Sequence, residues 1–244
     1  MAGGAVASFL ARLSPARWRR RSPASSSRAR SAGDVLFHEG DVSDAVLVVS
    51  DGHVKIVKLG LDGRTALIEL RGPGDLLGEQ GVIDRVVRSA SIVALTDLTV
   101  LRVPADRFRE LLRTEAPITN AVLETVVARL RRASLRQLEL STSDGVSRVC
   151  ARLGELGERF GRPVAAGPAD SAGIVIDAPM SQQELADWVG LSRDGVVRAL
   201  GVLRREGLVT TSRQQFVLVD ATEIRRRAAP TDAYFAADER PARP

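Results

Sequence analysis

SQQELADWVGLSRDGVVRAL, residues 181–200, has the pattern of two short helices joined by a tight turn. Ser181 and Glu184 have the spacing of a capping box, in which each side chain binds a free backbone amide at a helix start. Gly190 can adopt the left-handed conformation that a sharp turn requires. Ser192 can cap the second helix. The pattern therefore predicts a helix-turn-helix.

The second helix of this pair has an apolar side and a charged side. Arg193 lies in its first turn, and Asp194 and Arg198 lie on the side away from the apolar positions. A guanidinium can bond two acceptors on a guanine edge, and a carboxylate can accept from a cytosine amino group. An ordinary surface ion pair between Asp194 and Arg198 is the alternative interpretation. Two short strands at 208–211 and 216–219 complete a winged helix-turn-helix, which favours DNA reading.

Upstream of this module lies a long helical pattern with a heptad seam. Such a seam can bury against its own domain or against a second copy of the chain, and the polar Gln137 favours a parallel homodimer. Ser141, Thr142 and Ser143 interrupt the pattern and predict a hinge, with Ser143 capping a further helix over 144–160. A Gly/Pro/Ala-rich stretch, 161–173, then leads to a brief strand at 174–176. The seam positions are Leu123, Val126, Leu130, Ala133, Gln137 and Leu140.

The segment from Gly33 to about Pro104 has the pattern of an all-β domain. Glycine-containing turn pairs recur along it, separated by short β-branched runs. Ala66, Ile68 and Leu70 alternate with Thr65, Leu67 and Glu69, as the two faces of a half-buried strand do. We expect a small antiparallel barrel or roll, with strands at 45–49, 54–59, 66–70, 90–95 and 98–103.

Charge is concentrated at the N-terminus. The chain has 244 residues, with 35 Lys plus Arg, 30 Asp plus Glu and one cysteine, which excludes a disulfide framework. Residues 1–32 hold seven arginines and no acid, so the rest of the chain carries 28 bases against 30 acids. The basic total is thus weak support for DNA binding by itself. In the leader, Ser14 and Pro15 have the pattern of an N-cap and a first helical position, which predicts a short amphipathic helix followed by a mobile basic segment. A transit peptide is the less favoured alternative.

Several motifs along the chain, and the order in which they occur, resemble those of the Crp-Fnr bacterial transcription regulators. The resemblance covers about Phe9 to Arg227. The resemblance implies an α+β fold with a cyclic-nucleotide-binding β-roll, a long dimer helix and a winged helix-turn-helix. The implied domains are a basic leader (1–32), the β-roll (33–116), the dimerisation helix and hinge (117–143), the DNA-binding domain (144–227) and a disordered tail (228–244). The matching motifs are Gly33–Asp41, Gly52–Lys55, Gly72–Asp75, Leu77–Glu79, Arg88–Ala90 and Ser192–Arg198.

The resemblance also implies a site for a cyclic nucleotide, with cAMP as the first candidate. A cyclic phosphodiester needs a guanidinium and backbone amides, which Arg88, Ser89 and the turn after Gly78 can supply. Glu79 would accept from the ribose 2′-hydroxyl, and Ser134 would approach the base. An Arg88–Glu79 ion pair in a pocket without ligand is the alternative. The candidate nucleotide-binding residues are Gly78, Glu79, Gln80, Arg88, Ser89 and Ser134.

Departures from the family pattern concern both sites. The loop from Glu79 to Arg88 is about one residue short, and Leu135 stands where some cAMP-binding relatives have a hydroxyl. Asp194 replaces a longer Glu, and Gly195 replaces a Thr. The resemblance therefore implies a palindrome related to, but different from, one with TGTGA half-sites. The candidate DNA-binding residues are Ser181, Gln182, Ser192, Arg193, Asp194, Gly195 and Arg198.

Other classes of function are disfavoured by the residues that the chain lacks. An iron-sulfur sensor needs several cysteines, and Cys150 is the only one. His38 and His53 fall in turn motifs, so neither a haem, a metal-dependent enzyme nor a catalytic triad is expected. We expect a cytoplasmic, non-enzymatic homodimer without metal, haem or membrane contact. Its partners would be palindromic double-stranded DNA and RNA polymerase; a ligand-free regulator, a different effector and a pure protein-interaction module remain alternatives.

Overall fold

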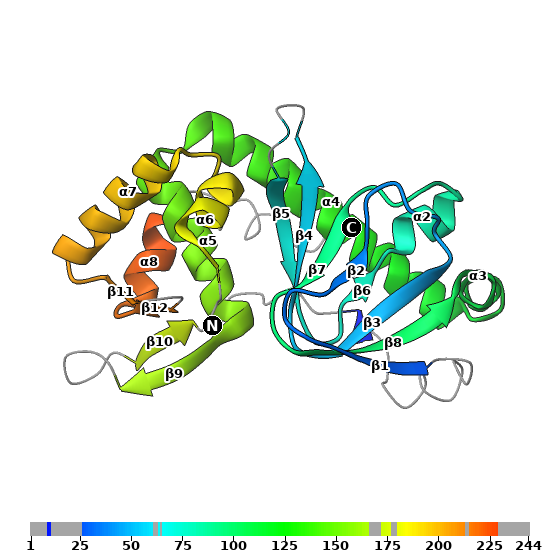
Figure 1. The fold of residues 1–244 in the computed structure, drawn as a ribbon. Helices are drawn as coiled ribbons and strands as arrows, with labels where there is room; N and C mark the ends of the chain where they lie inside the picture. The colour runs from blue at the N-terminus through cyan, green and yellow to red at the C-terminus, as the bar shows by residue number, and fades with distance from the viewer. Residues whose placement is uncertain are drawn as a thin grey trace, which may run out of the picture. The chain divides into compact units, whose positions relative to one another are not determined.

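The computed structural model describes residues 9–10, 26–60, 63, 65–165, 172–176, 180–212 and 215–228 (Figure 1). The chain divides into two compact units, Met1–Leu130 and Arg131–Pro244. Both units combine helices with an antiparallel sheet structure, as the expected α+β class requires. Within the described part of the chain, no helix is long and apolar enough to cross a bilayer.

Two four-stranded sheets form the β-roll of the first unit. Their strand orders are β1-β8-β3-β6 and β2-β7-β4-β5, with antiparallel pairing between the described neighbours. The strands predicted from the β-branched runs are present. The bounds are β1 Ser26–Arg30, β2 Val35–Phe37, β3 Ala45–Asp51, β4 Val54–Leu59, β5 Thr65–Arg71, β6 Leu76–Leu77, β7 Ser91–Ala94 and β8 Leu98–Pro104.

Strand β3 is buried on both faces. Val46 and Val48 face a cluster that includes residues of α3 (Ala105–Thr114) and the start of α4 (Ala116–Thr142). Leu47 and Val49 face the other sheet. Successive side chains of a strand point to opposite faces, so a continuous apolar run is what a strand covered on both sides needs.

The predicted mobile leader is partly wrong. Ser26–Arg30 forms β1, an edge strand paired with β8, and Phe9 is fully buried in the cluster that contains Phe108. A Ser/Arg segment has no apolar alternation, so its pairing depends on the free edge of β8 and could not be read locally. The expected N-terminal helix, which begins at Ser14, and the tail after Ala228 lie outside the described residues.

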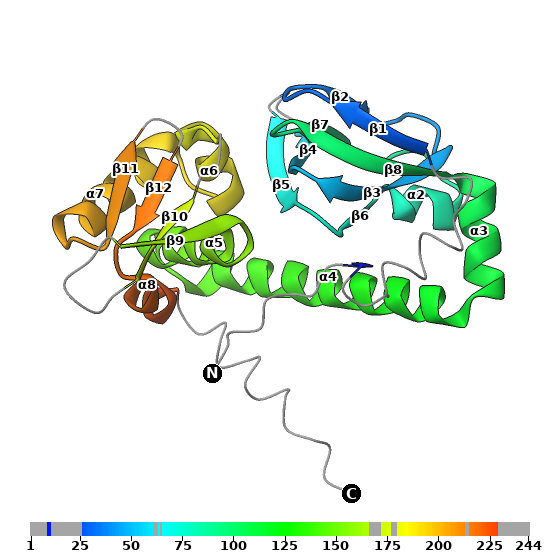
Figure 2. The same cartoon turned by 90° about the horizontal axis from the view of Figure 1, so that it is seen from below.

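The second unit contains a four-stranded sheet of order β11-β12-β10-β9. The predicted strands after the helix pair are present, shifted by one residue. Its helices are the end of α4, α5 (Gly145–Phe160), α6 (Gln182–Val189), α7 (Arg193–Arg205) and α8 (Ala221–Arg227), which lies beside α5 in Figure 2. Its strands are β9 Gly161–Ala165, β10 Ala172–Ile176, β11 Val209–Ser212 and β12 Gln215–Leu218.

Strand β9 occupies part of the stretch that was expected to have no regular structure. It pairs with β10 in the register Gly161 to Ile176, at the edge of the sheet. An edge strand tolerates Pro163, whose missing amide is not needed on the open side. A Cβ on Gly161 would lie 2.2 Å from the Gly157 carbonyl oxygen. The glycine therefore marks a close approach between α5 and the sheet and does not mark a loop.

The expected hinge is shorter than the serine-rich triplet suggested. Helix α4 continues through Ser141 to Thr142, and Asp144, not Ser143, caps α5 by accepting from the Ser147 amide at 2.8 Å. The Ser141 and Thr142 hydroxyls donate to carbonyl oxygens one turn earlier, which keeps both residues helical. The break between the two helices is thus confined to residues 143–144.

Candidate nucleic-acid interface and nucleotide cradle

The turn between α6 and α7 has the predicted geometry. The Ser181 hydroxyl accepts from the Glu184 amide at 3.1 Å, and the Glu184 carboxylate accepts from the Ser181 amide at 2.8 Å. Gly190 has a φ of 65°, in the left-handed region, and Ser192 caps α7 by accepting from the Gly195 amide at 3.1 Å. The capping box and both helix ends are therefore confirmed as local structure.

Helix α7 buries one face and exposes the other. Val196, Ala199, Leu200 and Leu203 are buried, whereas Arg193, Asp194 and Arg198 are exposed. Among the residues that the structure describes, these three charged side chains make no hydrogen bond or ion pair. The alternative of an Asp194–Arg198 surface pair is therefore wrong. The exposed charges remain available to a partner of the helix.

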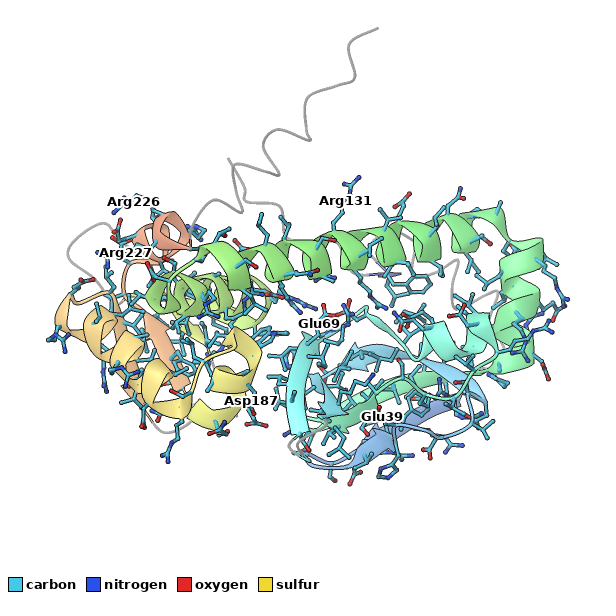
Figure 3. The ribbon with its side chains drawn as sticks, turned by 90° about the horizontal axis from the view of Figure 1, so that it is seen from above. Glu39, Glu69, Arg131, Asp187, Arg226 and Arg227 are labelled. Atoms are coloured by element: carbon cyan, nitrogen blue, oxygen red, sulfur yellow. The ribbon has the colours of Figure 1, made fainter. Side chains whose placement is uncertain are left out.

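Several other arginines of this unit are bonded within the protein. Arg226 and Arg227, labelled in Figure 3, both bond to Glu223 on α8, and these bonds lower the Glu223 pKa to about 2. Arg204, near the end of α7, donates to the Thr211 hydroxyl on β11 at 3.4 Å and so ties the helix to the wing. Arg193 and Arg198 differ from these three arginines because their guanidinium groups have no bonding partner among the described residues.

The expected phosphate cradle forms around α2 (Glu79–Asp84). Gly78 is its N-cap, with a φ of 73°. A Cβ at this position would lie 2.5 Å from Nη1 of Arg88 and 2.9 Å from the Phe37 ring. Only glycine fits here, both for the backbone conformation and for the close approach of Arg88.

Arg88 is buried and held by the protein itself. Its guanidinium donates to the Gly78 carbonyl at 2.8 Å and to the Ala45 carbonyl at 2.6 Å. It also lies 3.6 Å above the Phe37 ring and 3.5 Å from Asp44. Burial lowers the pKa of Arg88, and nearby carboxylates oppose that shift. A phosphate at this site would have to replace the two carbonyl oxygens as the acceptor.

Glu79 is paired with Arg129 and not with Arg88. Arg129, on α4, bonds to the Glu79 carboxylate and donates to the Leu76 carbonyl at 2.6 Å. The predicted alternative of an Arg88–Glu79 pair is therefore wrong. Sequence reasoning missed Arg129, although it follows Val126, which packs on the core, by one helical turn. Helical periodicity could have placed it on the inward face.

The remaining predicted nucleotide residues are exposed. The Ser89 hydroxyl donates to the Gln80 side chain at 3.4 Å, so the two ends of the segment 80–89 come together. Arg85, between them, has a left-handed φ of 61°, which is unusual for a residue with a Cβ and accommodates the short loop. Ser134 is an exposed residue of the second unit, so its approach to the base stays a prediction.

Comparisons with known proteins agree with both halves of this description. Residues 28–115 match the cyclic nucleotide-binding domain family, and residues 147–227 match the Crp-like helix-turn-helix domain family. The cyclic AMP receptor protein of Thermus thermophilus is 30% identical over 177 residues, covering 72% of this chain and 76% of that protein. The chain belongs to the Crp-Fnr family of transcription regulators.

Two further regulators match most of the chain. The CRP-like cAMP-activated global transcriptional regulator of Mycobacterium tuberculosis is 28% identical over 196 residues, covering 80% of this chain and 85% of that protein. The structure of the c-di-GMP-responsive global regulator CLP of Xanthomonas campestris has a TM-score of 0.68 at 26% identity. It covers 83% of this chain and 98% of its own. The chain is therefore a CRP-like regulator with a cyclic-nucleotide-binding and a DNA-binding domain.

The two histidines of this Crp-Fnr protein lie between strands of the roll, and its cysteine lies in α5. The His38 and His53 amides donate to side chains of nearby turns, at 2.9 and 3.0 Å. Burial raises the pKa of the Cys150 thiol to about 11, so the thiol is protonated at neutral pH. Among the described residues, no group of three or more His, Cys, Asp or Glu could hold a metal ion.

Proposed function

We propose that the protein is a homodimeric, sequence-specific DNA-binding regulator whose operator affinity is controlled by a cyclic nucleotide, with cAMP as the first candidate. The observation that carries the proposal is the exposed, uncommitted charge at the start of α7, inside a capped helix-turn-helix. Arg193 and Arg198 would bind guanine edges in the major groove, and Asp194 would contact cytosine directly or through water. Ser181, Gln182, Ser192 and Gly195 would contact the backbone phosphates.

A second copy of the chain would cover an apolar stripe on α4. Leu123, Val127 and Leu130 repeat at intervals of four and three residues and are 60%, 39% and 67% exposed. This stripe differs from the predicted seam, because Val126 packs against the chain's own core and Val127 takes its place outside. Leu138 and Leu140, further along the helix, are also exposed. An apolar stripe at heptad spacing supports a parallel helix pair.

Leu130→Glu is expected to raise the dimer dissociation constant about a hundredfold, because it would bury a carboxylate from each chain in the seam. Sedimentation over a range of concentrations measures the change. Arg131→Glu is the matched control, since it adds the same carboxylate to the next residue, whose side chain projects from α4 in Figure 3. Equal dissociation constants for the two variants would contradict the proposed interface.

Nucleotide binding would exchange internal partners for ligand atoms. The phosphate would take the place of the Gly78 and Ala45 carbonyls at Arg88, and the ribose hydroxyl would compete with Arg129 for Glu79. The donor set fits a cyclic phosphodiester in its chemistry. The relatives named for cAMP and for c-di-GMP support this ligand class.

Calorimetry with cAMP, cGMP and c-di-GMP, together with operator binding in each state, tests the control by ligand. We expect one nucleotide to bind and to change operator affinity by about 5- to 150-fold. Ser89→Ala should lower the affinity for that nucleotide and leave the operator affinity of the ligand-free protein unchanged. Identical operator affinity in all states would reject ligand control.

A ligand-independent regulator is the second candidate, and the internal bonding of Arg88 favours it. Both terminal nitrogens of the Arg88 guanidinium already have carbonyl acceptors, and the Asp44 carboxylate lies 3.5 Å away, although Nε is buried without an acceptor among the described residues. The protein itself therefore supplies much of the compensation that a buried cation needs without a bound anion. This candidate predicts tight, specific DNA binding with no heat of binding from any of the three nucleotides. The same calorimetric series therefore separates the two candidates.

A further inference from the structure

A buried cluster of charges joins the end of α4 to α5 inside the second unit. Arg152 on α5 donates to Glu139 on α4 at 2.5 Å and to Glu155 at 2.7 Å. Arg136 on α4 donates to Glu155 at 3.2 Å, so the bonds cross between the helices in both directions. Arg152 is 8% exposed and Glu139 is 12% exposed. Neither helix can turn against the other without breaking several of these bonds.

Trp188 brings α6 onto the same cluster. The guanidinium groups of Arg136 and Arg152 each lie 5.7 Å from the centre of the indole ring, which is within the range of a cation–π contact. Trp188 is buried, and its indole nitrogen has no hydrogen-bond partner among the described residues. The ring is therefore held through its face, by the same arginines that bond to Glu139 and Glu155.

The turn of the helix-turn-helix also contacts the end of α4 and the start of α5. A Cβ on Gly190 would lie 2.7 Å from the Leu140 side chain, so α4 packs closely against this turn. Arg148 on α5 donates to the Val189 and Gly190 carbonyls at 3.0 and 3.2 Å, which closes the C-terminus of α6. The segment that orients α7 is thus held at two places, by Leu140 at the end of α4 and by Arg148 at the start of α5.

The charges of the cluster depend on one another. Burial alone raises the pKa of Glu155, but the surrounding arginines outweigh it and bring this pKa below its usual value. The carboxylate is therefore ionised at neutral pH. Removing one member of a buried charge set leaves its partner unpaired and costs more than the pair contributes. A conservative change at the edge of the cluster should consequently move the helices.

We propose that the hinge cluster, Arg136, Glu139, Arg152, Glu155 and Trp188, positions the helix-turn-helix against the end of α4 and so sets the affinity for the operator. The inference rests on the proposed DNA reading by α7. A dimer must present two such helices at the spacing of two half-sites, so a small change in orientation reduces specific binding. Contacts to phosphates alone tolerate that change. These are positioning residues, since none of them needs to touch DNA.

Glu139→Gln tests the proposal, because it removes the charge at the α4 side and keeps the size of the side chain. We expect about a tenfold loss of affinity for a duplex selected from a library built around a TGTGA palindrome. Affinity for random duplex should be unchanged. In a Trp18→Phe background, Trp188 is the only tryptophan. In that background, Glu139→Gln should shift the wavelength of the Trp188 fluorescence emission. Glu158→Gln, an exposed acid on α5, is the matched control.

A second variant keeps the proposal testable if Glu139→Gln does not fold. Trp188→Leu retains apolar volume and removes the ring face, and it should cause a similar loss of operator affinity. The double variant should lose no more operator affinity than the single variant with the larger loss, because both changes disrupt the same coupled set of contacts. Operator affinity and Trp188 emission equal to those of Glu158→Gln would overturn the proposal. An Arg198→Ala variant with unaltered operator affinity would instead reject DNA reading by α7, while a shifted Trp188 emission would still support the cluster.

Discussion

Arg88→Ala is expected to destabilise the protein by about 2–4 kcal/mol with no nucleotide present. The change leaves the Gly78 and Ala45 carbonyls without their donor and removes the cation above the Phe37 ring. Hydrogen bonds from charged donors and cation–π contacts in buried sites each contribute on the order of 1–3 kcal/mol. In thermal denaturation followed by circular dichroism, the first unit should melt about 10 °C lower.

The control for this prediction is Ser89→Ala. Ser89 belongs to the same expected phosphate set but is exposed, and its hydroxyl makes only a long contact with Gln80. Its loss should change the melting temperature by no more than about 2 °C. If Arg88→Ala melts like Ser89→Ala, then Arg88 has no structural role without ligand. The arginine would in that case serve an incoming anion only.

Arg198→Ala is expected to weaken operator binding by about 1–3 kcal/mol, or roughly 5- to 150-fold, with relaxed preference at one base pair of each half-site. Its guanidinium is exposed and makes no bond within the described residues, so the loss would come from DNA and not from folding. Mobility-shift competition between operator variants and random duplex measures both affinity and preference. The melting temperature should stay the same.

Arg226→Ala is the matched control for the DNA prediction. It removes the same charge from the same unit, at a side chain that is 72% exposed and bonded to Glu223. A general electrostatic attraction to DNA would weaken equally in both variants and would show no change in base preference. Equal losses would therefore reject base reading by Arg198 and leave only non-specific binding.

Local patterns in the sequence were sufficient for the helix-turn-helix. The capping box, the turn glycine and the cap of α7 involve residues within a few positions of each other, so each could be read from spacing alone. The same holds for β3, whose continuous apolar run reflects burial on both faces. The family motifs placed the cradle residues in the right segments, although they could not say what those residues bond to.

Errors arose where the partner is distant in the sequence. Strand β1 forms because β8 offers an open edge about 70 residues later in the chain. Val126, which was predicted to lie on the apolar seam of α4, is partly buried and packs against the core of the roll. The sequence pattern of a helix cannot show which of two neighbouring apolar residues faces the core, because that depends on a surface formed by distant parts of the chain.

The sequence alone determined the family, the order of the two domains and the residue types available for DNA and nucleotide, since these follow from motifs and local spacing. Only the tertiary structure decided which charged side chains bond to other groups of the protein. Arg88 and Glu79 were expected to face a ligand or each other, yet they bond to Ala45 and Arg129, which lie 43 and 50 residues away. Buried charges must find partners wherever the fold brings them, and that choice is a long-range property of the folded chain.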